Sequence, residues 1–331
     1  MKKMSSAASL KAVVAAMALA LLTAAFAETS LRPGTHRISI AYEQPKNPAH
    51  EHLRDLLVEA RVLEQVQEIL GAFRLPKVLP ISIESCDGES DARYLYDEAR
   101  IKVCYEYIEA IWKDAPAQTT ALGVSPIDAI VGPLADVFFH EFGHALFNLH
   151  KIPVLGREEY AADTTSAMLI LMLAKNNDPR RLIMGAAYWY TDDLETDITV
   201  KPTEYSSVHG TPHQRFFNLL CVAYGSDQKI FGDLVEKGLL PEERAEDCKS
   251  EFQQAEHAFN LLIRPHMDQS LAKQVFGRRW IPEATLQPPR FANPVADTAA
   301  SPGATGSAGA TERTGATESP GATDTPAPST N

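Results

Sequence analysis

The sequence predicts an α+β fold, in which a small sheet is followed by a mostly helical half. Alternation of apolar and polar residues, the pattern of a half-buried strand, occurs only before about Tyr105. Beyond that point apolar residues recur at helical spacing. The chain has 331 residues, of which 45% are hydrophobic and 22% charged, so it is long and apolar enough to enclose a full core.

The N-terminal elements follow in order from the spacing of their apolar residues. His36–Tyr42 alternates apolar and polar positions, and we expect a strand there. Leucines recur at helical spacing through His50–Phe73, which predicts one amphipathic helix. Leu79–Ser85 is expected to form a second strand, and Arg93–Tyr96 with Arg100–Tyr105 a hairpin.

Three helices are expected after the sheet. The first surrounds His140–His144, because large apolar residues flank that segment on both sides and indicate a buried helix. The second begins near Arg157, after a loop marked by Pro153 and Gly156. The third is Pro241–Ile263, whose apolar residues lie along one stripe at three-four spacing.

Both ends of the chain differ in composition from the body. Residues 1–27 combine a basic leader, an apolar run and the small-x-small site Ala25-Phe26-Ala27, which is the pattern of a secretory signal peptide. The apolar run is shorter than the ~20 residues of a membrane-spanning helix, which argues against an uncleaved anchor. Residues 293–331 are rich in Ala, Thr, Gly, Ser and Pro and are expected to form a disordered tail. One domain therefore spans residues 28–292.

The charge of the chain limits its partners. The net charge is −12, and removal of the three lysines in residues 1–27 makes it −15. A surface of this sign repels phosphate backbones and anionic lipids, so we expect no nucleic-acid partner. No segment after residue 27 is long and apolar enough to cross a bilayer, so we expect no stable membrane insertion. The leader predicts a protein that is exported and either periplasmic or secreted.

The motif with the clearest chemistry is His140-Glu141-Phe142-Gly143-His144. Residues four apart lie on the same face of a helix, so His140 and His144 can bind one Zn²⁺ ion together. Glu141 lies about a hundred degrees round the helix and can take a proton from water as a general base. This is the arrangement of hydrolytic zinc sites. In the alternative, both histidines are satisfied by hydrogen bonds in a purely structural role.

A catalytic zinc site needs a third protein ligand. His150 occupies the third-histidine position of the elongated motif, but Phe147 stands where that motif needs a glycine to turn the chain. Glu159 and Asp163 lie one turn apart on the following helix. We expect Glu159 to complete the zinc ligands and Asp163 to accept the free ring N–H of a ligand histidine. Glu158 is the alternative ligand, although the residue one turn beyond it is an alanine.

These two halves, His-Glu-x-x-His and Glu-x-x-x-Asp, resemble the gluzincin metallopeptidases, the thermolysin-like class. The longer stretch from His140 to Asp163, together with Cys104-Tyr-Glu-Tyr107, resembles a bacterial domain family named "putative metallopeptidase". The resemblance covers nearly all of residues 28–291. It implies a zincin-like fold and one zinc ion bound by His140, His144 and Glu159, with Glu141 as general base. It implies no particular substrate.

Two further sets of residues remain to be assigned. An oxyanion donor is needed as water attacks a carbonyl, and we choose His209, with His213 and Tyr205 as alternatives in the same loop. In an exported protein the four cysteines are expected to form disulfides between the partners nearest in sequence, Cys86–Cys104 and Cys221–Cys248.

The leading hypothesis from the sequence is an exported zinc metallopeptidase that acts on a peptide or protein substrate. The competing hypothesis is a non-catalytic periplasmic binding protein in which zinc is a structural element. Chelator-sensitive hydrolysis of peptides distinguishes the two.

Overall fold

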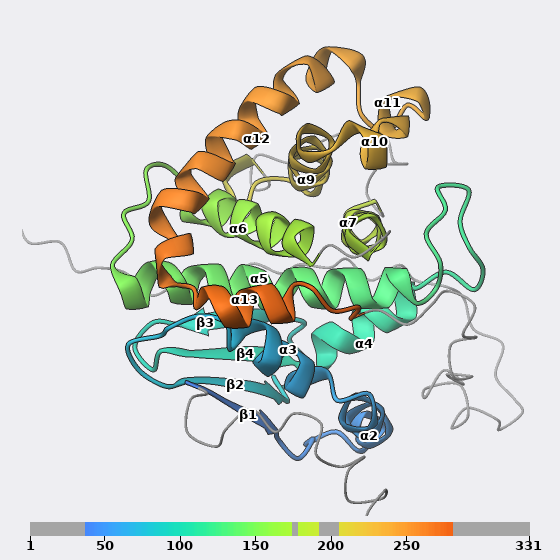
Figure 1. Ribbon diagram of the computed structural model, residues 1–331. Coiled ribbons are helices and arrows are strands. Elements are labelled where there is room, and N and C mark those ends of the chain that lie inside the picture. Colours follow the sequence, from blue (N-terminus) through green and yellow to red (C-terminus); the bar gives the residue numbers. More distant parts are fainter. Residues whose placement is uncertain (1–36, 174–177, 192–204, 281–331) are drawn as a thin grey trace, which may run out of the picture.

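The computed structural model describes residues 37–173, 178–191 and 205–280. The predicted signal peptide, residues 1–27, and the predicted tail, residues 293–331, lie outside the described residues, so both stay predictions. Within the described part the fold is α+β, as the sequence predicts (Figure 1).

A four-stranded mixed sheet forms the N-terminal layer. Its strands are β1 (Ile38–Tyr42), β2 (Leu79–Glu84), β3 (Ala92–Leu95) and β4 (Arg100–Cys104), in the order β1-β2-β4-β3. β1 and β4 run parallel to β2, while β3 pairs antiparallel with β4 as the predicted hairpin. The predicted strands are therefore confirmed, and β3 lies at an edge of the sheet.

The prediction of a single helix over His50–Phe73 is wrong. The chain forms a short 3₁₀ turn and then two helices, α2 (Glu51–Glu59) and α3 (Val62–Leu70). They are separated at Arg61, which has a left-handed backbone with φ of 54°. The Tyr42 hydroxyl accepts a hydrogen bond from Leu63 N at the start of α3, at 2.7 Å. Leucine spacing continues across the break, so periodicity alone gives no sign of it.

The helical half surrounds one long central helix, α5 (Asp128–His150). Figure 1 shows α5 across the middle of the molecule, with the sheet on one side and the other large helices on the opposite side. The predicted helix Pro241–Ile263 is confirmed as α12 (Glu242–Leu262). The remaining helices are α4 (Tyr105–Asp114), α6 (Glu158–Met172), α7 (Asp178–Trp189), α9 (Pro212–Ser226), α10 (Gln228–Phe231), α11 (Asp233–Glu236) and α13 (Gln269–Val275).

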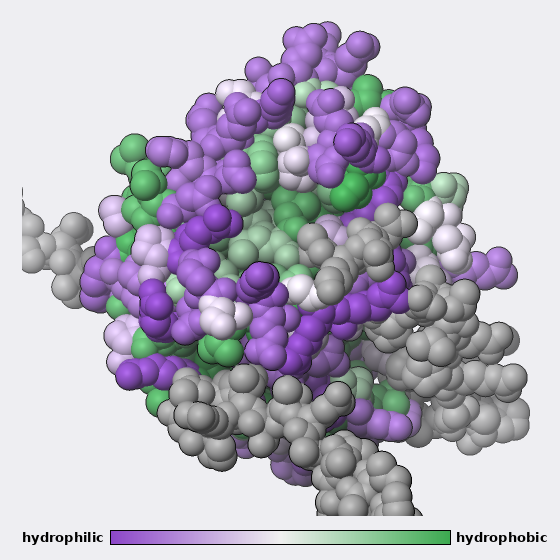
Figure 2. Space-filling model, in the orientation of Figure 1, coloured by the Kyte–Doolittle hydropathy of each residue, from purple (hydrophilic) through white to green (hydrophobic). Residues whose placement is uncertain are grey.

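Apolar side chains from both halves bury against α5, and few of its residues reach solvent. Phe138, Phe139 and Phe142 of this helix are almost completely buried. Polar side chains cover most of the face of the molecule seen in Figure 2, and apolar ones are confined to smaller patches. No helix in the described ranges is both long enough and apolar enough to span a bilayer.

Two disulfides form as predicted. Cys86, just after β2, pairs with Cys104 at the end of β4, with a Cα–Cα distance of 5.5 Å. Cys221 of α9 pairs with Cys248 of α12, with a Cα–Cα distance of 4.9 Å. Two structural disulfides are consistent with an extracellular location, since the reducing cytosol keeps cysteine thiols reduced and unpaired.

The closest approach of α5 and α7 depends on glycine. A Cβ atom added at Gly185 would overlap the carbonyl of Asp128, and one added at Gly132 would lie 2.5 Å from Ala186 N. We therefore expect Gly185→Ala to lower the free energy of unfolding by about 1–3 kcal/mol, the usual cost of overpacking a core. Helix propensity alone predicts the opposite sign, a gain of about 1 kcal/mol. Urea unfolding decides between them, and a stabilised variant would contradict the packing argument.

Two histidines stack where α5 ends. The rings of His150 and His266 are 3.7 Å apart between centroids. Burial and the neighbouring His266 lower the pKa of His150, while burial and Arg74 lower the pKa of His266. The unfolded chain therefore binds these protons more readily than the folded one does. Their contribution to stability is complete above the ordinary histidine pKa of about 6.5 and is lost as the pH falls below it.

We expect the double variant His150→Gln, His266→Gln to lose less stability than the wild type on acidification from about pH 7.5 to about pH 5.5. Urea midpoints at the two pH values measure this difference. Equal losses in the two proteins would mean that the stacked pair does not contribute to the acid sensitivity.

Candidate metal centre

Helix α5 holds the two histidines of the motif on one buried face. His140 is 4% exposed and His144 6% exposed, and their Nε2 atoms lie 3.2 Å apart. Both are deep in a helix that is apolar on most of its sides. Two imidazoles so placed need polar partners, because unpaired polar groups are costly to bury.

Helix α6 supplies those partners after a reversal of the chain. Lys151, at the end of α5, and Gly156 both adopt positive φ angles, which turn the backbone so that α6 packs back on α5. A Cβ atom added at Gly143 would be 3.2 Å from Cα of Ala162, so the two helices approach closely at the glycine within the motif. This contact brings the acidic first turn of α6 to the histidines.

One carboxylate of α6 lies between the two imidazoles. Glu159 Oε2 is 3.1 Å from His140 Nε2 and 3.2 Å from His144 Nε2. Two ring nitrogens and one carboxylate oxygen thus converge on one point. This is the donor set that zinc takes in hydrolytic enzymes, so the residues present fit such an ion.

The other ring nitrogens face two more carboxylates. His140 Nδ1 donates to Asp163 Oδ1 at 2.8 Å. His144 Nδ1 is 2.8 Å from Glu158 Oε1, and Glu158 also accepts a hydrogen bond from the Tyr96 hydroxyl. Glu158, the alternative ligand, thus contacts Nδ1 of His144, whereas Glu159 contacts Nε2 of both histidines.

Glu141 lies beside the cluster. It is 5% exposed, and its Oε2 accepts a hydrogen bond from the backbone N–H of Tyr94 in β3 at 2.5 Å. Burial raises the pKa of Glu141 above its ordinary value. A carboxylate with a raised pKa is a stronger base than a free glutamate and takes up a proton more readily.

His209 is also brought to the cluster, from the loop before α9. Its Nε2 lies 3.1 Å from Glu159 Oε2, and its side chain is half exposed. Thr211, two residues further on, forms a capping box with Gln214 and fixes the start of α9. Among the described residues, neither His213 nor Tyr205 makes a hydrogen bond or ion pair with these groups.

Contacts within the cluster shift the pKa values of its histidines and carboxylates strongly. Burial lowers the pKa of His140, but hydrogen bonds to Asp163 and Glu159 outweigh this and raise it to about 10. Burial raises the pKa of Glu159. Hydrogen bonds to His140, His144 and His209 outweigh this effect, so the pKa lies well below its ordinary value. A centre that stabilises positive charge on its imidazoles so strongly also suits a metal cation, which replaces the protons.

Two further residues at the centre, Tyr96 and Arg215, could not be found from motif spacing. Tyr96 follows β3, and Arg215 of α9 donates to Asp163 through Nε at 3.0 Å and Nη2 at 2.6 Å. Both reach the centre from elements distant in the chain. Spacing on a single helix therefore could not assign them a role.

Residues 42–263 match the sequence profile of a family described as "Putative metallopeptidase". The chain belongs to this family. The match spans β2, β3, β4, α5, α6 and α9, so every residue of the candidate metal centre lies within the part shared with the metallopeptidase family. Membership implies a metal and supports a hydrolase acting on peptides. Searches of curated proteins and of solved structures found no match to this chain.

Proposed function

We propose that this protein is an exported, zinc-dependent peptidase. The observation that carries the proposal is the convergence of His140 Nε2, His144 Nε2 and Glu159 Oε2, with a buried carboxylate beside them. Membership of the metallopeptidase family and the two disulfides support it. Export follows from the signal peptide predicted over residues 1–27.

Each residue of the centre has a distinct role in this proposal. His140, His144 and Glu159 hold one Zn²⁺ ion, which supplies Lewis acidity toward water and a peptide carbonyl. Glu141 takes a proton from the attacking water and returns it to the amine that leaves. The Tyr94 N–H holds the Glu141 carboxylate in place during both transfers. Asp163 and Glu158 orient the two imidazoles through their Nδ1 atoms.

His209 is proposed as the donor to the oxyanion that forms on the substrate carbonyl. Its half-exposed ring is open to a substrate while its Nε2 faces the cluster. The same position supports a second candidate function. Because His209 Nε2 lies only 3.1 Å from Glu159 Oε2, it could act as a fourth ligand. A closed four-ligand site is structural rather than catalytic, and the protein would then be a periplasmic binding protein.

The variant His209→Ala distinguishes these two roles. For an oxyanion donor we expect kcat to fall roughly 10²–10³-fold while zinc affinity is unchanged. For a fourth ligand, zinc affinity falls instead. Peptidase assays and zinc titrations on the same preparation separate the outcomes. His213→Ala, in the same loop, is the matched control and should alter neither quantity.

Metal content and a substrate screen test the proposed function itself. We expect about one zinc per chain by mass spectrometry, in line with a single catalytic site. Peptide hydrolysis should stop with a chelator and return with added zinc. The peptides screened should include cationic ones, since the net charge of −15 expected after removal of residues 1–27 attracts them. Bound zinc without hydrolysis of any peptide would reject the peptidase and leave the binding protein.

A further inference from the structure

An arginine lies behind the metal centre, on the side of Asp163 that faces away from it. Arg215 of α9 makes two hydrogen bonds to the Asp163 carboxylate, from Nε to Oδ2 at 3.0 Å and from Nη2 to Oδ1 at 2.6 Å. Asp163 Oδ1 also accepts the hydrogen bond from His140 Nδ1 at 2.8 Å. Arg215, Asp163 and the imidazole of His140 thus form one continuous chain of contacts.

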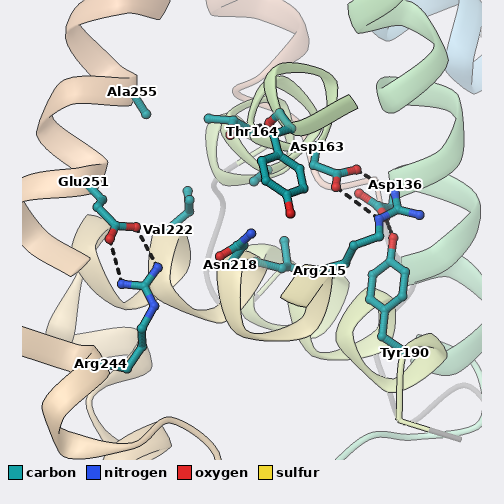
Figure 3. A pocket seen from close by; sticks show the side chains of 13 residues that line it. Asp136, Asp163, Thr164, Tyr190, Arg215, Asn218, Val222, Arg244, Glu251 and Ala255 are labelled. Carbon is teal, nitrogen blue, oxygen red and sulfur yellow. Dashed lines mark hydrogen bonds and ion pairs between the residues drawn. The ribbon is translucent and has the colours of Figure 1, made fainter. Parts of the chain in front are cut away.

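The guanidinium itself is fixed by its surroundings. It lies over the Tyr190 ring, 4.8 Å from the centroid. The Tyr190 hydroxyl donates to Asp136 Oδ2 at 2.9 Å, and Ser166 donates to Asp136 Oδ1 at 2.7 Å. Figure 3 shows Arg215, Asp163, Asp136 and Tyr190 gathered at one end of a pocket. The planar guanidinium stacks on the Tyr190 ring and makes two hydrogen bonds to a carboxylate, a geometry that a lysine ammonium cannot reproduce.

We propose that Arg215 is a positioning residue for the zinc site and acts through Asp163. Its two hydrogen bonds hold the carboxylate in the orientation that accepts the Nδ1 proton of His140. That bond fixes the ring and its tautomer, so that Nε2 points toward the metal as the donor atom. The inference rests on the metal site of the proposed function, but it does not depend on peptide hydrolysis.

The pocket beside Arg215 allows a free guanidinium ion to replace the side chain in a truncated variant. It has a volume of about 360 Å³, and Figure 3 shows the Arg244–Glu251 pair at the end opposite Arg215. Arg215 keeps 20% of its side chain accessible. Truncation of Arg215 to alanine would leave a space of guanidinium size joined to this pocket. A free guanidinium ion can therefore reach the Asp163 carboxylate from solution.

The experiment measures zinc affinity by competition with a chromophoric chelator. We expect Arg215→Ala to bind zinc roughly 10–100-fold more weakly than the wild type, the usual effect of losing a group that orients a metal ligand. Millimolar guanidinium, far below denaturing concentrations, should restore much of the affinity in this variant and change nothing in the wild type. Unchanged zinc affinity, or a loss that guanidinium does not restore in a folded variant, would overturn the proposal.

Arg244→Ala is the matched control. Arg244 lines the same pocket and makes an ion pair with Glu251 at 2.7 Å, but its pair lies at the opposite end of the pocket from Asp163. This variant should keep the zinc affinity of the wild type with or without guanidinium. A comparable loss in Arg244→Ala would assign the effect to the pocket in general and overturn the role of Arg215.

A double-mutant cycle covers the case in which Arg215→Ala does not fold. Arg215→Lys keeps the charge and loses the fork, and it should weaken zinc binding in the wild-type background. In an Asp163→Asn background the same change should have no further effect, because the residue through which it acts is already altered. Additive losses, or no loss in either background, would overturn the inference. A wild type that binds zinc but cleaves no peptide would reject the peptidase alone and leave this test intact.

Discussion

Replacing Glu141 with glutamine is expected to stop peptide hydrolysis while zinc remains bound. Glutamine has nearly the same shape and can still accept the Tyr94 N–H bond that Glu141 Oε2 accepts at 2.5 Å. It cannot take up a proton, so kcat/KM should fall by roughly 10²–10⁴-fold, the usual contribution of a general base. The proposed ligand atoms of His140, His144 and Glu159 are untouched, and metal content should be that of the wild type.

Glu106→Gln is the matched control for this substitution. Glu106 also accepts backbone N–H bonds, from Cys86 at 3.0 Å and Gly88 at 3.2 Å, but it is not in contact with the cluster in the described structure. It should retain full activity. Steady-state kinetics measures kcat/KM of the two variants, and mass spectrometry measures their zinc content. If Glu141→Gln hydrolyses peptides as fast as the wild type, the residue is not the base.

Replacing His140 with alanine should abolish both zinc binding and the stability that zinc provides. The change removes one proposed ligand and leaves the Asp163 and Glu159 carboxylates without the imidazole that lies between them. In the wild type, zinc at a hundred times its dissociation constant stabilises the fold by about 2.7 kcal/mol. A chelator should therefore lower the melting temperature of the wild type and leave that of His140→Ala unchanged.

His150→Ala is the matched control here, because His150 belongs to the same helix but stacks on His266. It should bind zinc and respond to the chelator as the wild type does. Calorimetry with and without chelator measures the effect. An equal response in His140→Ala and the wild type would mean that zinc binds elsewhere or not at all.

Periodicity predicted the positions of the strands and of α12, but not the interruption of the first helical segment. Alternation located β1, β2 and the hairpin, and helical spacing located α12 within a residue at each end. The break at Arg61 was not predictable, because a single left-handed residue changes the direction of the chain without interrupting the leucine spacing.

The candidate site was predictable to the extent that its residues share a helix. The spacing of His140 and His144 on α5, and of Glu159 and Asp163 on α6, places each pair on one face. The contact of Glu158 with His144 was not predictable from spacing along α6, because His144 belongs to α5. Tyr96 and Arg215 reach the site only through the packing of separate layers.

The two disulfides divide the molecule in a way that bears on its mechanical behaviour. One joins the ends of strands within the sheet, and the other joins α9 to α12, so neither crosses the central helix α5. The two layers are instead joined by apolar packing on α5 and by contacts at the candidate metal centre, where Tyr96 comes from the sheet side and Arg215 from α9. Covalent bonds therefore make each layer cohesive, whereas cohesion between the layers depends on non-covalent packing and on the occupancy of the centre. Loss of the metal should loosen the joint between the layers before either layer comes apart.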